Sequence, residues 1–237
     1  MARFLLPPDQ WKTDPILTGD EARHLSQVLR IRQGGIVTVF DGAGRRARAE
    51  VLAVRRDEVP LRLFEQSHRS PGKPSIHLAQ AIPKGKNMDL IVQKAVELGV
   101  AGIQPLITAH TIVKPGDGKA DKWRRTALEA CKQCGQDWLP VIPDAQSFFT
   151  WLPLATGELK LIASLAEGAG SFRETLLSFP SPASITMLIG PEGDFSADET
   201  KAALDAGFIP VSLGEIVLRV ETASLFCLSV LKHRYGC

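Results

Sequence analysis

The sequence lacks the long hydrophobic runs of a membrane protein. No stretch of its 237 residues approaches the roughly 18 consecutive apolar residues that a membrane-spanning helix needs. The apolar run within Met1–Pro8 is too short for a secretory signal, and internal repeats and low-complexity tracts are absent. A content of 44% hydrophobic and 23% charged residues is typical of a globular chain. We therefore expect a globular, cytoplasmic protein without a membrane partner.

The sequence also has few of the residues that build metal sites. Cys131 and Cys134 form a C-x-x-C pair, but no second C-x-x-C and no H-x-x-x-H follows. Because a structural zinc site needs four ligands, we interpret the pair as structural thiols on one face of a helix and expect no metal. Cys227, in an apolar helical pattern, and the terminal Cys237 do not suggest a disulfide framework.

Net charge is small, at +2, but it is unevenly distributed. Residues 1–72 hold 12 of the 28 basic and 9 of the 26 acidic side chains, which leaves a net charge of −1 on residues 73–237. Six arginines of the first part lie within about one tenth of the chain: Arg23, Arg30, Arg32, Arg45, Arg46 and Arg48. Such a run is usually a solvated surface, yet the guanidinium fork also matches phosphate oxygens. The residues alone support both interpretations equally.

Residues 1–72 have the pattern of a small β domain. The turn Asp41–Gly44 separates two strand patterns, 36–40 and 45–56, which predicts a hairpin. Thr18 followed by Glu21 predicts a capping box at the start of a helix. A small antiparallel β-barrel with one helix is the expected product.

Residues 66–75 read as a linker, after which strand and helix patterns alternate. The alternation predicts an α/β domain over residues 73–237, with a mostly parallel sheet covered by helices on both faces. The expected strands are 76–82, 103–108, 160–165, 185–189 and 210–213, and the expected helices are 88–98, 121–134, 197–206 and 221–234. Ser196, with Glu199 three residues later, is expected to cap the helix 197–206.

Two loops of this second domain are unusual. In the loop 188–195, Gly190 and Gly193 allow a close approach of the backbone to a ligand, although an ordinary strand-to-helix turn would also explain them. Its spacing matches neither G-x-G-x-x-G nor a P-loop, which disfavours a dinucleotide or nucleoside triphosphate site. The loop 213–223 places Arg219 between apolar residues and a helix start, where a structural ion pair with Glu221 or Glu192 is the simplest explanation.

These loops resemble the RsmE family of SPOUT methyltransferases. The resemblance rests on Ile-Gly-Pro-Glu-Gly-Asp-Phe-Ser at 189–196 and Leu-Gly-Glu-Ile-Val-Leu-Arg-Val-Glu-Thr-Ala at 213–223. Met88–Val100 is similar to the family's Q-K-A-x-E-L-G segment, and His24–Arg30 to its H-x-x-x-V-L-R. The four motifs occur in the family's order and cover nearly the whole chain.

The resemblance implies a PUA-like RNA-binding β-barrel over residues 1–72 and a SPOUT α/β methyltransferase domain with a trefoil knot over residues 73–237. It implies methylation of N3 of a uridine in the 16S ribosomal RNA of the small ribosomal subunit, with S-adenosyl-L-methionine as cofactor, by a homodimer. The implied cofactor-binding positions are Leu165, Leu188, Gly190, Gly193, Leu213, Gly214, Val217 and Leu218. Val220 and Asp194 depart from the family, where threonine and glycine are common.

Arg219 is the predicted catalytic residue, stabilising charge that develops on the uracil oxygens. Glu192 is the second candidate, either orienting Arg219 or acting on the base. The six arginines of residues 1–72 would then bind RNA phosphates. Two alternatives stay open: a SPOUT enzyme acting on another RNA or another base atom, and a non-catalytic RNA-binding assembly factor.

Overall fold

The computed structural model describes residues 1–12, 14–112, 116, 118–166 and 168–236. The chain divides into two compact units: unit 1 comprises Met1–Pro71 with Cys131–Leu139, and unit 2 comprises Gly72–Ala130 with Pro140–Cys237. Among the described residues, no helix is long and apolar enough to span a bilayer.

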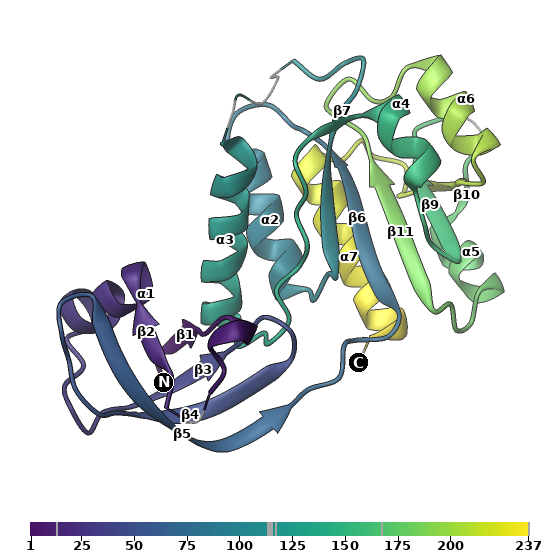
Figure 1. Cartoon of the computed structure of the whole chain (residues 1–237). Helices are drawn as coiled ribbons and strands as arrows, with labels where there is room; N and C mark the ends of the chain where they lie inside the picture. The colour runs from purple at the N-terminus through teal and green to yellow at the C-terminus, as the bar shows by residue number, and fades with distance from the viewer. Residues whose placement is uncertain (13, 113–115, 117, 167, 237) are drawn as a thin grey trace. The chain divides into compact units, whose positions relative to one another are not determined.

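Unit 1 is built on a curled sheet of five strands in the order β1-β3-β4-β5-β2 (Figure 1). β1 pairs with β3 in parallel and the other neighbours are antiparallel. Asp41 closes the predicted β3–β4 hairpin, because its carboxylate accepts the backbone N–H groups of Ala43 and Arg45 at 2.7 and 2.9 Å. The strands are β1 (Arg3–Leu5), β2 (Ile16–Thr18), β3 (Ile36–Phe40), β4 (Arg45–Val51) and β5 (Glu58–His68).

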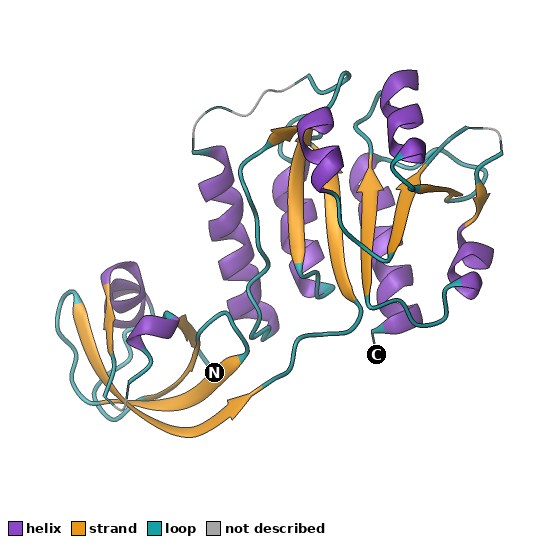
Figure 2. Cartoon of the chain, turned by 45° about the vertical axis from the view of Figure 1, so that its right-hand side comes forward, coloured by secondary structure: helices purple, strands orange, loops and turns teal. Residues whose placement is uncertain are grey.

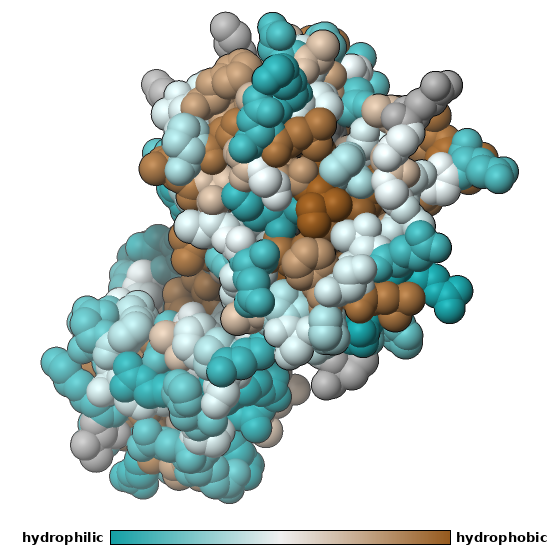
Figure 3. Space-filling model, turned by 90° about the vertical axis from the view of Figure 1, so that its right-hand side faces the viewer, coloured by the Kyte–Doolittle hydropathy of each residue, from teal (hydrophilic) through white to brown (hydrophobic). Residues whose placement is uncertain are grey.

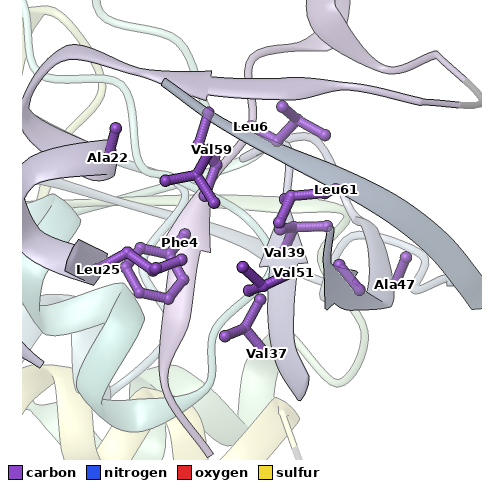
Figure 4. Close-up of a cluster of buried hydrophobic side chains, with 12 residues drawn as sticks. Phe4, Leu6, Ala22, Leu25, Val37, Val39, Ala47, Val51, Val59 and Leu61 are labelled. Carbon is purple, nitrogen blue, oxygen red and sulfur yellow. The ribbon is translucent and has the colours of Figure 1, made fainter. Parts of the chain in front are cut away.

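Alternate strand residues and one helical segment form the core of unit 1. Phe4, Val39 and Leu61 come from three different strands and are fully buried together with Leu25 (Figure 4). Leu25 lies in the helical segment made of α1 (Gly19–Arg23) and the wider turn η2 (His24–Val28); a short helix, η1 (Pro8–Gln10), precedes β2. Because successive strand side chains point to opposite faces, one face of the sheet carries this core.

Two local predictions for unit 1 are wrong. Thr18 precedes α1 but makes no side-chain cap, and the Glu21 carboxylate accepts the backbone N–H of Leu5 at 3.0 Å and pairs with Lys132. The second hairpin strand ends at Val51 rather than at residue 56, and β5 continues to His68, inside the expected linker. The start of α1 and the ends of β4 and β5 therefore depend on contacts with residues distant in the chain.

A segment from the middle of the chain, residues 131–139, belongs to unit 1. The backbone N–H of Gly44 bonds the carbonyl of Asp137 at 3.1 Å, and the N–H of Leu139 bonds the carbonyl of Gly42 at 2.9 Å. The Asp137 carboxylate is fully buried and pairs with Arg3 at 2.7 Å. The β3–β4 turn is therefore held by residues that the sequence pattern placed in a helix and the loop that follows it.

Unit 2 contains the predicted parallel sheet. Its seven strands lie in the order β10-β12-β9-β11-β6-β7-β8, and every neighbouring pair is parallel. They are β6 (Ser75–Ala81), β7 (Gly102–Ile107), β8 (Gln146–Ser147), β9 (Leu159–Ala163), β10 (Gly170–Ser171), β11 (Ser184–Ile189) and β12 (Ile209–Ser212). The short β8 and β10 at the two edges were not predicted.

Helices cover both faces of this sheet, as Figure 2 shows. Ala79 of β6 packs in a hydrophobic cluster with Phe148 of α4 (Phe148–Trp151) and Ala203 of α6 (Ala197–Asp205). The next residue, Gln80, is buried on the opposite face, where its side-chain oxygen accepts the hydroxyl of Ser224 at 2.6 Å. Ser224 lies in α7 (Val220–Tyr235), which packs against α2 (Asn87–Glu97).

The remaining helical elements are α3 (Lys119–Cys134), η3 (Leu152–Leu154) and α5 (Phe172–Ser178). The start of α6 confirms a local prediction, since Ser196 and Glu199 form a reciprocal capping box. The long helices α2, α3, α6 and α7 lie within two residues of their expected bounds, whereas α4 and α5 were missed because each presents at most two turns of pattern.

Candidate active site

Three loops of unit 2 enclose a pocket of about 460 Å³. They follow β9, β11 and β12, which are neighbours in the sheet, so that their carboxyl ends meet at one edge. Ligands of parallel α/β sheets bind at this edge, and the volume is within the range of small-molecule sites. Asn87, at the start of α2, closes a further side.

Most predicted cofactor and catalytic positions line this single pocket. The lining includes Leu165, Gly190, Glu192, Leu213, Gly214, Val217, Leu218 and Arg219. Two predicted cofactor positions do not line it. Leu188 is fully buried in the sheet core, and Gly193 lies where a Cβ would meet the His110 side chain at 3.1 Å.

The loop after β11 is compact and held by its own residues. A Cβ on Gly190 would meet Asp194 Oδ1 at 3.0 Å and the Phe195 ring at 3.1 Å, so a larger residue would force these side chains to shift. Asp194 has a φ of +57°, a conformation that favours glycine. Its carboxylate accepts the N–H of Phe195 at 2.8 Å, a local bond of the kind that lets aspartate adopt this conformation.

The loop after β12 presents apolar side chains and free backbone groups to the pocket. Ile216 and Val217 are 74% and 76% exposed, and Leu165 on the neighbouring loop is 62% exposed. Figure 3 shows exposed hydrophobic residues, in brown, on one face of unit 2. Among the described residues, the backbone N–H groups of Ile216, Val217 and Leu218 have no hydrogen-bond acceptor. Apolar walls with unpaired backbone donors fit a purine ring and its polar edge.

Arg219 caps the amino end of α7, and its side chain is exposed at the pocket. The ion pair with Glu221 or Glu192, the simplest explanation from the sequence, is not formed. Glu192 Oε1 accepts the backbone N–H of Lys84 at 2.9 Å, while Glu221 Oε2 accepts the Asn87 amide at 3.0 Å. Within the described chain the Arg219 guanidinium has no hydrogen-bond or ion-pair partner, so it is available to a ligand.

The six arginines predicted to bind RNA are all in unit 1, and four of them contact carboxylates. Arg23 pairs with Asp57 at 2.8 Å, Arg45 with Asp41 at 2.6 Å, Arg48 with Glu65 at 2.9 Å, and Arg46 lies 3.8 Å from Asp137. The hydrogen bond with Asp57 raises the pKa of Arg23. The guanidinium groups of Arg30 and Arg32 have no such partner in the part of the chain that the structure describes.

The C-x-x-C pair is split between two environments. Cys131 is buried, and its burial raises the pKa of the thiol to about 12, whereas Cys134 is exposed. Burial likewise raises the pKa of Cys227 to about 12. Among the described residues, no group of three or more His, Cys, Asp or Glu side chains could hold a metal ion. Cys237 lies outside the described residues.

Comparisons with known proteins decide the family. Residues 71–232 match the family model of an RNA methyltransferase domain, and residues 17–64 match that of an RNA methyltransferase PUA domain. The chain is 31% identical to ribosomal RNA small subunit methyltransferase E of Synechocystis over 96% of this chain and 76% of the relative. The chain belongs to the RsmE family. The resemblance inferred from the four motifs is confirmed.

Other members extend this result to structure. The enzyme of the same name from Bacillus subtilis is 28% identical over 92% of this chain and 89% of its own. The Neisseria gonorrhoeae member, solved with bound S-adenosyl methionine, is 30% identical with a TM-score of 0.90, covering 100% of this chain and 98% of its own. A Legionella pneumophila protein with bound SAM gives 35% identity, a TM-score of 0.90 and the same coverage. The PUA-like plus SPOUT fold class is thereby confirmed.

The motifs did not reveal every residue at this RsmE-type pocket. Asn87 and Glu221 lie 134 positions apart and Lys84 and Glu192 lie 108 positions apart, yet each pair is hydrogen bonded. Asn87 directly precedes the Met88–Val100 motif and Glu221 lies within the 213–223 motif. The only sequence signal was therefore proximity to a motif, and the pairing itself needed the fold.

Proposed function

We propose that this protein transfers a methyl group from S-adenosyl-L-methionine to N3 of a uridine in the 16S ribosomal RNA of the small ribosomal subunit. The observation that carries the proposal is the convergence of the family's two loop motifs on one pocket in a chain of the RsmE family. The names of the relatives, as small-subunit ribosomal RNA methyltransferases, support the substrate.

Residues of the three loops hold the cofactor. Leu165, Val217 and Leu218 supply apolar surface, and Gly190 and Gly214 allow the backbone to approach closely. Gly214 has a φ of +124° and open space around it, which suits a chain reversal at the pocket rim. Leu188 and Gly193 support the loop from beneath and beside it. The bound cofactor supplies a sulfonium methyl group as the electrophile.

Arg219 is the proposed catalytic residue. The uracil N3 carries a proton, and its transfer to solvent water leaves negative charge spread over the two flanking carbonyl oxygens. An exposed guanidinium without a competing carboxylate stabilises that charge as the N3–methyl bond forms and the sulfur–methyl bond breaks. Glu192 lines the same pocket, where its carboxylate accepts the backbone N–H of Lys84. The target base must leave its stack to reach these groups.

Membership of the RsmE family also suggests the RNA contacts, the cellular location and the oligomeric state of the protein. Arg23, Arg30, Arg32, Arg45, Arg46 and Arg48 of the PUA-like unit bind RNA phosphates. The protein acts in the cytoplasm as a homodimer, and the loops around the pocket belong to a trefoil knot. No metal takes part.

Transfer of labelled methyl groups tests this function. We expect incorporation into the RNA of small subunits, measured on assembled subunits and on naked 16S RNA side by side, and calorimetric binding of S-adenosyl-L-methionine. Binding without transfer to either substrate would favour a SPOUT enzyme for another RNA. Absence of both would favour a non-catalytic assembly factor and contradict the proposal.

A further inference from the structure

The loop between β6 and α2, residues Pro83–Lys86, is fastened to two segments that line the pocket. The backbone N–H of Lys84 donates to Glu192 Oε1 at 2.9 Å, which ties the loop to the segment after β11. Asn87, the first residue of α2, donates its amide to Glu221 Oε2 at 3.0 Å, which ties it to the start of α7. Both anchors are carboxylates of pocket-lining residues.

These anchors leave the positive charge of the loop unneutralised. Glu192 and Glu221 use their carboxylates on a backbone N–H and an amide, not on an ammonium group. Lys84 and Lys86 are exposed, and within the described chain neither ammonium group has an ion-pair or hydrogen-bond partner. Gly85 between them has a φ of +65°, a tight turn with open space around it. Two free ammonium groups therefore flank a turn that is hydrogen bonded to a pocket-lining residue.

We propose that Lys84 and Lys86 bind phosphate groups of the RNA next to the target nucleotide, and that Glu192 is a positioning residue that holds this loop in place. The inference rests on the proposed function. A base extruded into a pocket brings its own backbone phosphates to the pocket rim, where fixed positive charge lowers the energy of the extruded state. Lysine suits this task because its ammonium group is a compact point charge that contacts phosphate from several directions.

The double variant Lys84→Ala/Lys86→Ala tests the phosphate contact. Loss of two contacts should make the plot of log affinity against log salt shallower by about 1.4, which is about a tenfold rise in KM for RNA near physiological salt. Binding of S-adenosyl-L-methionine, measured by calorimetry, should stay unchanged. The matched control is Lys122→Ala/Lys201→Ala, which removes two exposed lysines that already pair with Asp89 and Asp205.

A pair of Glu192 variants tests the positioning role. The amide oxygen of Glu192→Gln can still accept the Lys84 N–H, so this variant should keep a KM for RNA close to that of the parent. Glu192→Ala cannot accept it and should raise the KM for RNA with a smaller effect on kcat. Equal losses of kcat in both variants would show that the carboxylate charge acts in the chemistry, and would overturn the positioning role.

The outcomes separate this inference from the proposed function. If the parent methylates RNA and the Lys84/Lys86 variant matches the control pair in KM and salt dependence, the loop does not bind RNA phosphate. If the parent transfers no methyl group to any RNA while binding S-adenosyl-L-methionine, the proposed function itself is wrong.

Discussion

Three arginines of unit 1 and the two lysines of the β6–α2 loop carry the same charge, but among the described residues only the arginines are paired with carboxylates. Arg23, Arg45 and Arg48 each contact a carboxylate within 2.9 Å, whereas Lys84 and Lys86 contact none within the described residues. The charge count of the sequence directs attention to the arginines and gives the lysines no prominence. Composition locates charge along the chain, but only the fold tells which charges are already neutralised.

The arginine pairs themselves differ in burial. Those with Asp57 and Glu65 are exposed, and exposed pairs contribute little to stability, so that an RNA phosphate can compete for their guanidinium groups. Asp137 is fully buried, pairs with Arg3 at 2.7 Å and lies 3.8 Å from both Arg46 and Arg69. Its role is to hold unit 1 together, while Arg46 and Arg69 beside it remain partly exposed.

The largest effect is expected at this buried carboxylate. Asp137→Ala leaves the largely buried Arg3 without its partner and should lower the free energy of unfolding by about 3–5 kcal/mol. Urea denaturation measures this change. Asp57→Ala, which breaks an exposed arginine pair in the same unit, should leave the transition close to that of the parent. Equal losses in the two variants would remove the distinction between buried and exposed pairs.

Arg219 should give the next largest effect. Arg219→Ala should fold and bind S-adenosyl-L-methionine, yet lower kcat by about 10²- to 10³-fold, which is typical for removal of one donor that stabilises developing negative charge. Single-turnover methyl transfer measures the loss. Arg125→Ala is the control, because Arg125 is an exposed arginine of α3 outside the pocket. Parent-like turnover by Arg219→Ala would exclude the catalytic role.

A smaller effect is expected from reversing the charge of Arg45, Arg46 and Arg48 together to glutamate. Loss of these contacts should weaken RNA binding and make its salt dependence shallower by about 2. Filter binding over a salt series measures both quantities. The matched control reverses three other exposed arginines of unit 1: Arg55, Arg56 and Arg62. If both triple variants lose the same RNA affinity, RNA binding depends on the total positive charge of unit 1 and not on Arg45, Arg46 and Arg48 in particular.

The sequence predicted those features that depend on contacts between residues close together in the chain. The five buried strands of unit 2 were found from short apolar runs, and the Ser196–Glu199 capping box from a spacing of three residues. Thr18 and Glu21 have the same spacing, but Glu21 is recruited by Leu5 and Lys132, which are distant in the chain. Local pattern is reliable where no distant partner competes for the same group.

The site follows the same rule. The two loop motifs were sufficient to bring most of the cofactor positions and Arg219 to one pocket, because both loops leave the carboxyl ends of parallel strands, β11 and β12, that only β9 separates. The partner of Glu192 could not be predicted, since Lys84 lies 108 positions away in a loop with no motif of its own. Among the described residues, the ammonium groups of Lys84 and Lys86 have no ion-pair partner. The sequence pattern could not show this, because it depends on which side chains the fold brings together.

The identity of the methylated nucleoside tests the central claim most directly. Small-subunit RNA incubated with the protein and S-adenosyl-L-methionine would be digested to nucleosides and analysed by mass spectrometry against authentic standards. The account predicts 3-methyluridine that appears with the parent protein and is strongly reduced with Arg219→Ala. A different methylated nucleoside, or 3-methyluridine formed equally well by Arg219→Ala, would contradict it.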